Sequence, residues 1–202
     1  MAKILVLFAH PALEKSRVHA RMLHHLKKVK NVTINDLYEE YPDFDVDVER
    51  EKKLLLAHDI IVMQHPFYWY SSPALIKQWM DLVLEHGWAY GSQGVALAGK
   101  KLMNAISSGG SRTAYSANGI NRLTVPQYLA PFNQTARLCK MEYLPPFVVH
   151  STHSQLQPEI EKYALDYASI ISNLVNDSYG QPQLLSVEYL NDLLPSAELS
   201  NA

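Results

Sequence analysis

A single cysteine, Cys139, occurs among the 202 residues of the chain. One cysteine excludes an internal disulfide, so the sequence fits a reducing compartment and predicts a cytoplasmic location. We interpret Cys139 as a small buried hydrophobe on a helix, because lone cysteines take that role more often than a catalytic one.

Long apolar runs are also missing. No segment approaches the roughly 20 consecutive apolar residues of a membrane-spanning helix. The apolar stretch in the opening MAKILVLFAHP is too short for a secretory signal, and we interpret it as a first strand. The sequence therefore predicts a soluble protein, although one that could dock on a membrane protein.

Charge of one sign is not in excess, since the net charge is -2 and the pI is about 6.5. No overall field would gather nucleic acid or anionic lipid, so nucleic-acid binding is not predicted. Hydrophobic residues make up 48% of the chain, enough for one well-buried core. We interpret the acidic stretch at 43–51 as a solvated helix start.

Several motifs of nucleotide and hydrolase chemistry are absent. HPALEKS follows the first apolar run where a dinucleotide-binding GxGxxG would stand, and neither a P-loop nor GxSxG occurs. The pairs His24-His25 and His150-His153 lack a nearby cysteine or acidic ligand at zinc spacing, so no metal site is predicted.

Apolar runs alternate with helical patterns along most of the chain. The runs are continuously apolar, as expected for strands covered on both faces of a parallel sheet. We predict an α/β fold, a doubly wound five-stranded parallel sheet with helices on both faces, over residues 1–175. Residues 176–202 differ in composition and form an appendage with one short helix around 184–194. The five predicted strands are 3–9, 32–36, 59–65, 101–107 and 146–151.

The loops after the first, third and fourth strands should meet at one sheet edge, where such folds bind small ligands. In the first loop, Ser16 can cap a helix whose N-terminus favours an anion such as phosphate, with Arg17 and His10 beside it. The alternative is that Ser16 is only a helix cap and His10 only a packed loop residue.

The other two loops suggest a planar ligand. PFYWYSSP places four aromatics after a strand that already supplies the core, so some should line a pocket, or instead a subunit interface. In SSGGSRTAY, Gly109 and Gly110 allow the backbone to approach a ring closely, and Tyr115 can donate a hydrogen bond to developing negative charge. The alternative for the glycines is an ordinary turn.

Together these segments resemble the flavodoxin-like NAD(P)H:quinone oxidoreductase family over roughly residues 3–174. AHP, HPFYWYSSPALIKQWMD, GWAYG, LAGKKLM and SSGGSRTAYSANGI stand in the family's order and spacing. LYEEYPDF and LPPF look most like the ancillary subunits of bacterial glutathione-regulated potassium-efflux systems, small flavoproteins that activate a membrane efflux channel.

The resemblance implies a flavin site with assigned residues. It places the flavin phosphate at His10, Ser16 and Arg17, and Tyr115 near the flavin carbonyl as the catalytic residue. Asn121 stands where longer animal-type members have a histidine. The isoalloxazine would lie along Phe67, Tyr68, Trp69 and Tyr70, with Ser107, Ser108, Gly109 and Gly110 at its other edge.

The resemblance also implies an activity. FMN is the expected cofactor, with FAD as the alternative, and NAD(P)H would pass a hydride through it to a quinone in a two-electron ping-pong cycle. A homodimer is expected, as is an ancillary role beside a potassium-efflux channel. Two alternatives remain, a regulatory binding subunit with little turnover and a flavodoxin-type electron carrier.

Overall fold

The computed structural model describes residues 1–194, so the end of the predicted appendage, 195–202, lies outside the described residues. Its centre is one parallel sheet with the strand order β2-β1-β3-β4-β5, and β6 also pairs with β4. This order, with the reversal between β1 and β3, confirms the predicted flavodoxin-like doubly wound sheet. The strands are β1 (Ile4–Phe8), β2 (Val32–Asp36), β3 (Ile60–Pro66), β4 (Lys101–Ser107), β5 (Glu142–Tyr143) and β6 (Phe147–Val149).

The predicted fifth strand, 146–151, corresponds to β6, and a further short strand, β5, precedes it. β5 pairs with the start of β4 and β6 pairs with its end, while Pro145 and Pro146 lie between them. A proline cannot donate a ladder hydrogen bond, which explains the break. The interruption leaves β6 as a short edge strand beside the carboxyl end of β4.

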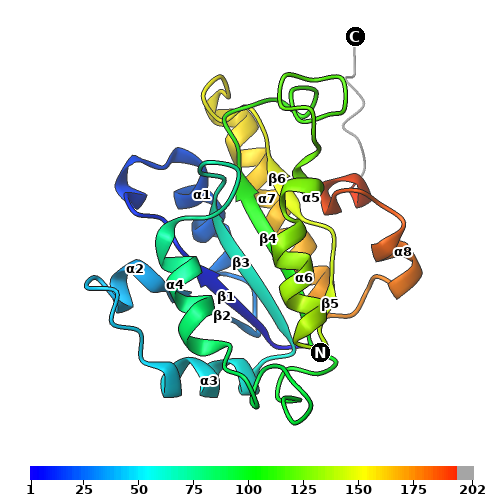
Figure 1. The fold of residues 1–202 in the computed structure, drawn as a ribbon. Helices are drawn as coiled ribbons and strands as arrows, with labels where there is room; N and C mark the ends of the chain where they lie inside the picture. Colours follow the sequence, from blue (N-terminus) through cyan, green and yellow to red (C-terminus); the bar gives the residue numbers. More distant parts are fainter. Residues whose placement is uncertain (195–202) are drawn as a thin grey trace.

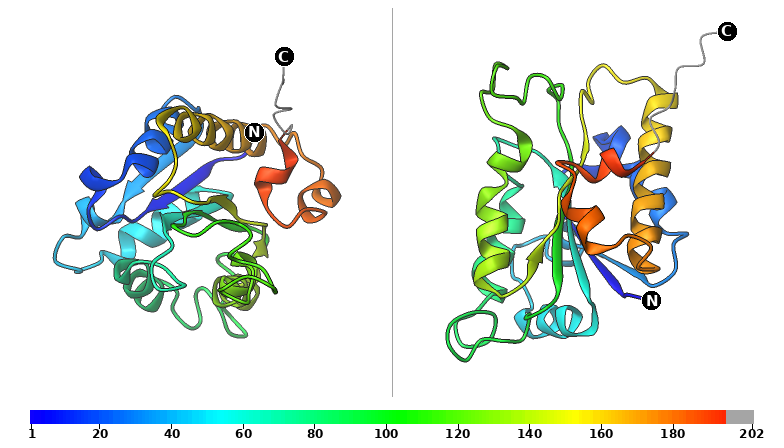
Figure 2. Two further views of the ribbon diagram at one scale, coloured as in Figure 1. Left: turned by 90° about the horizontal axis from the view of Figure 1, so that it is seen from above. Right: turned by 90° about the vertical axis from the view of Figure 1, so that its right-hand side faces the viewer.

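Helices cover both faces of the sheet (Figures 1 and 2). One face carries α1 (Arg17–Leu26) and α7 (Gln157–Val175), and the other carries α3 (Val48–Ala57), α4 (Ala74–Val83) and α6 (Ala130–Leu138). Each face has its own buried apolar cluster, since successive strand side chains point to opposite sides. The remaining short elements are η1 (Leu13–Lys15), α2 (Leu37–Glu40), α5 (Val125–Tyr128), α8 (Gln181–Leu185) and η2 (Leu190–Leu193).

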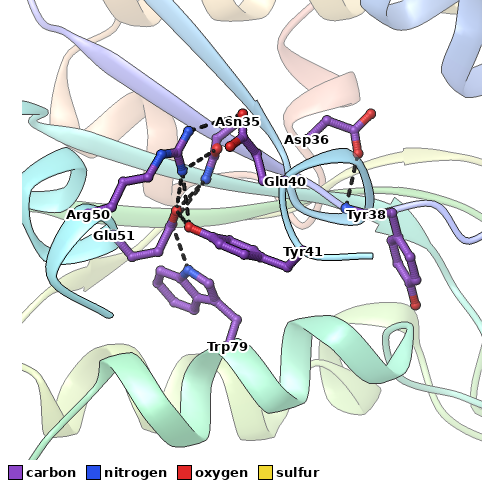
Figure 3. Close-up of polar contacts among 8 residues, drawn as sticks. All are labelled: Asn35, Asp36, Tyr38, Glu40, Tyr41, Arg50, Glu51 and Trp79. Carbon is purple, nitrogen blue, oxygen red and sulfur yellow. Dashed lines mark hydrogen bonds and ion pairs between the residues drawn. The ribbon is translucent and has the colours of Figure 1, made fainter. Parts of the chain in front are cut away.

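A buried carboxylate joins β2, α3 and α4 on one side of the molecule (Figure 3). The Glu51 side chain is fully buried and accepts hydrogen bonds from Asn35 Nδ2 at 2.9 Å, Tyr41 Oη at 2.7 Å and Trp79 Nε1 at 2.8 Å. Arg50 adds an ion pair at 2.6 Å. The prediction of a solvated 43–51 segment is wrong at Glu51, because its donors come from three other parts of the chain.

Within residues 1–194, no helix is both long and apolar enough to cross a membrane.

Candidate functional site

Four loops meet at the carboxyl ends of β1, β3, β4 and β6, along the upper edge of the sheet in Figure 1. They are 9–16, 67–73, 108–124 and 150–156. Because parallel strands end at the same edge, the three loops predicted from the sequence do lie together, and the loop after β6 joins them.

The first loop ends at the start of α1, where two backbone N–H groups are free. Ser16 Oγ accepts from the His19 amide at 3.2 Å and so caps α1, as predicted. The amides of Arg17 and Val18 have no hydrogen-bond partner among the described residues. Free N–H groups at a helix start favour an anion, and the exposed Arg17 guanidinium beside them adds positive charge.

His10 lies at the end of β1 beside this helix start. Its Nδ1 accepts a hydrogen bond from the Ala12 amide at 3.1 Å, which leaves the ring proton on Nε2. Burial lowers the pKa of His10, partly opposed by Glu14. The ring is therefore a neutral donor at neutral pH and does not add charge to the anion site.

A chain of buried hydrogen bonds runs from α7 to the end of β4. Tyr167 Oη donates to Gln64 Oε1 at 3.0 Å, and Gln64 Nε2 lies 3.3 Å from His19 Nδ1. His19 Nε2 lies 2.9 Å from Ser107 Oγ. Tyr167, Gln64 and His19 are all fully buried.

In this series of buried hydrogen bonds, the donor of each bond can be assigned. The Tyr167 hydroxyl has Gln64 as its only hydrogen-bond partner among the described residues, so it must donate there. Gln64 then donates through its amide to His19 Nδ1, and the His19 proton lies on Nε2 and is donated to Ser107. Ser107 therefore keeps its own hydroxyl proton for a ligand, and its side chain is half-buried at the strand end.

A second chain lies on the opposite face of the same strands. Asn104 Nδ2 lies 3.0 Å from His65 Nε2, and Tyr143 Oη donates to Asn104 Oδ1 at 2.6 Å. His65 Nδ1 is 2.9 Å from the Pro66 carbonyl and donates to it. Burial lowers the pKa of His65 to about 4, and burial also takes the pKa of His19 well below its ordinary value.

These two chains were not predicted from the sequence. Gln64, His65 and Asn104 are polar residues inside apolar strands, and that interruption is the signal that could have found them. Their partners could not be named, because Tyr143 and Tyr167 lie about 40 to 100 residues further along the chain.

The aromatic loop after β3 divides between the core and the surface. Phe67 is buried in the core, whereas Trp69 is 93% exposed. Trp69 and Tyr70 have φ angles of 50° and 62°, in the left-handed region that side chains rarely adopt. Two consecutive aromatics in this region are a strained arrangement, and backbone strain of this kind clusters at binding sites.

Tyr115 joins this loop through an aromatic cluster. Its ring centroid lies 5.7 Å from that of Phe67 and 6.1 Å from that of Tyr128, and Tyr70 stacks on Tyr128 at 4.9 Å. Asn121, at the position of the animal-type histidine, accepts from Tyr70 Oη at 3.3 Å. Tyr128, which sequence reasoning missed, donates to the Asn121 carbonyl at 2.7 Å.

The two glycines lie close to two rings of the protein itself. A Cβ on Gly110 would lie 2.8 Å from the Tyr115 ring, and one on Gly109 would lie 2.8 Å from the His153 ring. Ser108 is buried, and its hydroxyl bonds to Gly110. Only Ser107 of the serine pair therefore presents a hydroxyl at the edge.

This edge suits a mononucleotide that carries a planar ring. The free amides of α1 and Arg17 fit a phosphate, the Ser107 hydroxyl fits a ring acceptor, and Trp69 offers an exposed aromatic face. Residues 1–194 contain no group of three or more histidine, cysteine or acidic side chains placed to hold a metal.

Strand order and site position together define a flavodoxin-like α/β protein with a ligand edge at its strand ends. The family model for the flavodoxin-like fold matches residues 2–171, and the chain belongs to this family.

Relatives and solved structures in the family are similar over nearly their whole lengths. The ancillary protein KefG of the Shigella flexneri glutathione-regulated potassium-efflux system is 40% identical over 172 residues, 85% of this chain and 94% of its own. General stress protein 14 of Treponema denticola, in complex with FMN, is 40% identical with a TM-score of 0.81, covering 85% and 99%. An NADPH-quinone reductase from P. pentosaceus is 34% identical with a TM-score of 0.75, covering 83% and 96%.

Proposed function

We propose that this protein is an FMN-dependent NAD(P)H:quinone oxidoreductase. The observation that carries the proposal is the meeting of a free helix N-terminus, a donor hydroxyl on Ser107 and the Tyr115 phenol at one sheet edge. The similarity to an FMN-bound protein and to an NADPH-quinone reductase supports it. When bound, FMN would supply the hydride chemistry that joins NAD(P)H to a quinone.

The phosphate is assigned to the start of α1. The free amides at Arg17 and Val18 bind its oxygens, Ser16 fixes the helix start, and the Arg17 guanidinium balances its charge. His10 donates from Nε2 without carrying charge of its own. One helix start of this kind fits the single phosphate of FMN, and the similarity to an FMN-bound protein supports FMN in preference to FAD.

The ring region is assigned to the three loops after β1, β3 and β4. Ser107 donates its hydroxyl proton, and the backbone of Ser108, Gly109 and Gly110 forms the edge beside it. Phe67 is buried beneath this region, and the exposed rings of Tyr68, Trp69 and Tyr70 offer the wall on which a planar ring would lie. Residues 1–175 thus form the flavin-binding domain, with 176–202 as its appendage.

Tyr115 is assigned the catalytic role. Its phenol donates a hydrogen bond to negative charge that develops on the ring or on the quinone oxygen. The packing of its ring against Phe67 and Tyr128 fixes its position before substrate binds.

The test begins with protein purified without added flavin. We expect yellow protein that releases FMN, bleaches with anaerobic NADPH and recovers its colour with a soluble quinone. Tyr115→Phe should keep the flavin and lose about 100-fold in kcat/KM, while Tyr163→Phe, on α7, serves as the control. Colourless protein that takes up no flavin would overturn the proposal.

A second role is favoured by the similarity to the potassium-efflux ancillary protein. We propose that the chain also acts as the ancillary activating subunit of such a channel, as a cytoplasmic homodimer on the inner face of the membrane. Trp69 and Ile120, on neighbouring loops, are 93% and 88% exposed and offer apolar contact surface. Light scattering tests the dimer, and titration with the channel's cytosolic domain tests the partner; a monomer that binds no such domain would overturn this role.

A further inference from the structure

The C-terminal segment 176–194 lies beyond the part of the chain that the family model matches, which ends at residue 171. The alignment with the efflux ancillary relative spans 172 residues, 85% of this chain. The segment is nevertheless well packed, since Leu184, Tyr189 and Leu190 are buried. Figure 2 shows it folded back beside α7 and β6.

The segment covers the open edge of the sheet. Leu190 N donates to the Pro146 carbonyl at 2.9 Å, and the Asn191 side chain bonds to both the amide and the carbonyl of Val148, at 2.9 and 3.0 Å. The Asn191 side chain thus satisfies the backbone N–H and C=O of Val148, which edge strand β6 would otherwise leave unpaired. Tyr189 packs into the apolar cluster on one face of the sheet and Leu190 into the cluster on the other.

An ion pair links this segment to the loop that carries Tyr115. The Arg112 guanidinium binds Asp192 with two hydrogen bonds of 2.6 and 2.9 Å, and lies 4.3 Å over the Tyr189 ring. The Tyr115 amide donates to the Arg112 carbonyl at 3.2 Å. A single residue, Arg112, therefore bonds both to the C-terminal segment and to the Tyr115 backbone.

The loop has few other tethers. Among the described residues, the hydrogen bonds that leave segment 111–123 are made by Arg112 to Asp192 and by Asn121 with Tyr70 and Tyr128. The remaining hydrogen bonds of the segment are internal turns. Loss of the Arg112–Asp192 pair would leave the loop with the hydrogen bonds of Asn121 and the packing of the Tyr115 ring against Phe67 and Tyr128.

We propose that the C-terminal segment 176–194 is a clamp that positions the Tyr115 loop, and that Arg112 and Asp192 are the positioning residues of this chain's active site. A bidentate ion pair restrains the orientation of the guanidinium as well as its distance. The clamp reduces the ordering that the loop must undergo when substrate binds. The kinetic part of this inference rests on the proposed reductase function, but the structural part does not.

Hydrogen exchange tests the clamp without flavin. Asp192→Asn keeps the shape of the side chain and removes its charge, and we expect amides of 111–123 to exchange at least fivefold faster while β1 and β3 stay protected. Asp166→Asn is the matched control, because Asp166 pairs with Lys162 one turn away on α7 and makes no hydrogen bond or ion pair with the loop. Unchanged loop exchange in Asp192→Asn, or faster exchange throughout the chain, would overturn the inference.

Charge reversal and kinetics complete the test. Arg112→Asp and Asp192→Arg should each loosen the loop, and their combination should restore protection. In FMN-loaded protein, Asp192→Asn should lower kcat/KM for the quinone about fivefold with little change in FMN affinity, and added salt should reproduce part of that loss. If the wild type binds no flavin, the reductase proposal fails while the exchange result still decides the clamp. If flavin binds and loop exchange rises but turnover does not change, the clamp has no role in positioning Tyr115.

Discussion

His19 Nε2 lies 2.9 Å from Ser107 Oγ, and this contact joins the first turn of α1 to the end of β4. It connects the phosphate end of the proposed flavin site to the ring end. The chain behind it, through Gln64 to Tyr167, determines which of the two side chains donates. The protein thereby makes the Ser107 hydroxyl a hydrogen-bond donor toward the ligand edge.

The first prediction concerns this series of hydrogen bonds from Tyr167 to Ser107. Ser107→Ala should weaken FMN binding about fivefold, the effect of one lost hydrogen bond of roughly 1 kcal/mol. Tyr167→Phe removes the donor that orients the Gln64 amide, so the affinity should fall by a smaller factor. Fluorescence titration with FMN measures both, and Tyr163→Phe on the same helix serves as the control.

The tautomer of His19 provides a separate readout. Nitrogen chemical shifts of the ring should show the proton on Nε2 in the wild type and a mixture in Tyr167→Phe. A wild-type protein with the proton on Nδ1 would contradict the assigned direction of the chain.

The second prediction concerns Gly110. An alanine there brings its Cβ to 2.8 Å from the Tyr115 ring, which must then move. Gly110→Ala should lower kcat/KM at least tenfold, because small displacements of a reacting group have large effects on rate. Gly180→Ala is the control, since its Cβ would meet ordinary contacts at 3.8 Å. Equal turnover in the two variants would show that the position of Tyr115 does not limit the reaction.

The third prediction concerns stability. Glu51→Ala leaves the donors of Asn35, Tyr41 and Trp79 unsatisfied and should lower the free energy of unfolding by about 3 to 5 kcal/mol. Glu49→Gln, on the exposed side of the same helix, should change it by less than about 0.5 kcal/mol. Urea unfolding measures both, and a small effect of Glu51→Ala would mean that water replaces the carboxylate.

The fourth prediction concerns pH. Burial lowers the pKa values of His65 and His150 to about 4. Between pH 6.5 and about 4 the unfolded chain binds protons that the folded chain does not, so stability must fall as the pH falls through this window. His65 alone would contribute a loss of about 3 kcal/mol by pH 4.

Urea unfolding at pH 7.5, 6.0 and 5.0 measures this slope, and ring NMR of His65 should show it neutral at pH 5.5. A flat stability profile, or a His65 that titrates near 6.5, would refute the burial argument. The exposed His24 ring provides an internal comparison in the same spectra.

The sequence predicted the fold class because continuous apolar runs and helical patterns are local properties. Ser16 as the cap of α1 followed from residue type and position. The short strand β5, which ends before Pro145 and Pro146, was missed because two residues are too few for a strand pattern. The sequence analysis assigned Gly109 and Gly110 to the approach of a ligand ring. It did not predict that the rings of His153 and Tyr115 would also lie beside them.

By itself, therefore, the sequence determined the alternation of strands and helices, the three loops that carry polar and aromatic residues, and the family resemblance. Only the tertiary structure decided that Glu51 is buried, that His19 donates to Ser107, and that the C-terminal segment reaches the Tyr115 loop through Arg112 and Asp192. These features depend on contacts between residues far apart in the chain. No local pattern fixes which distant donor meets a given acceptor, because that pairing is set by how the elements pack.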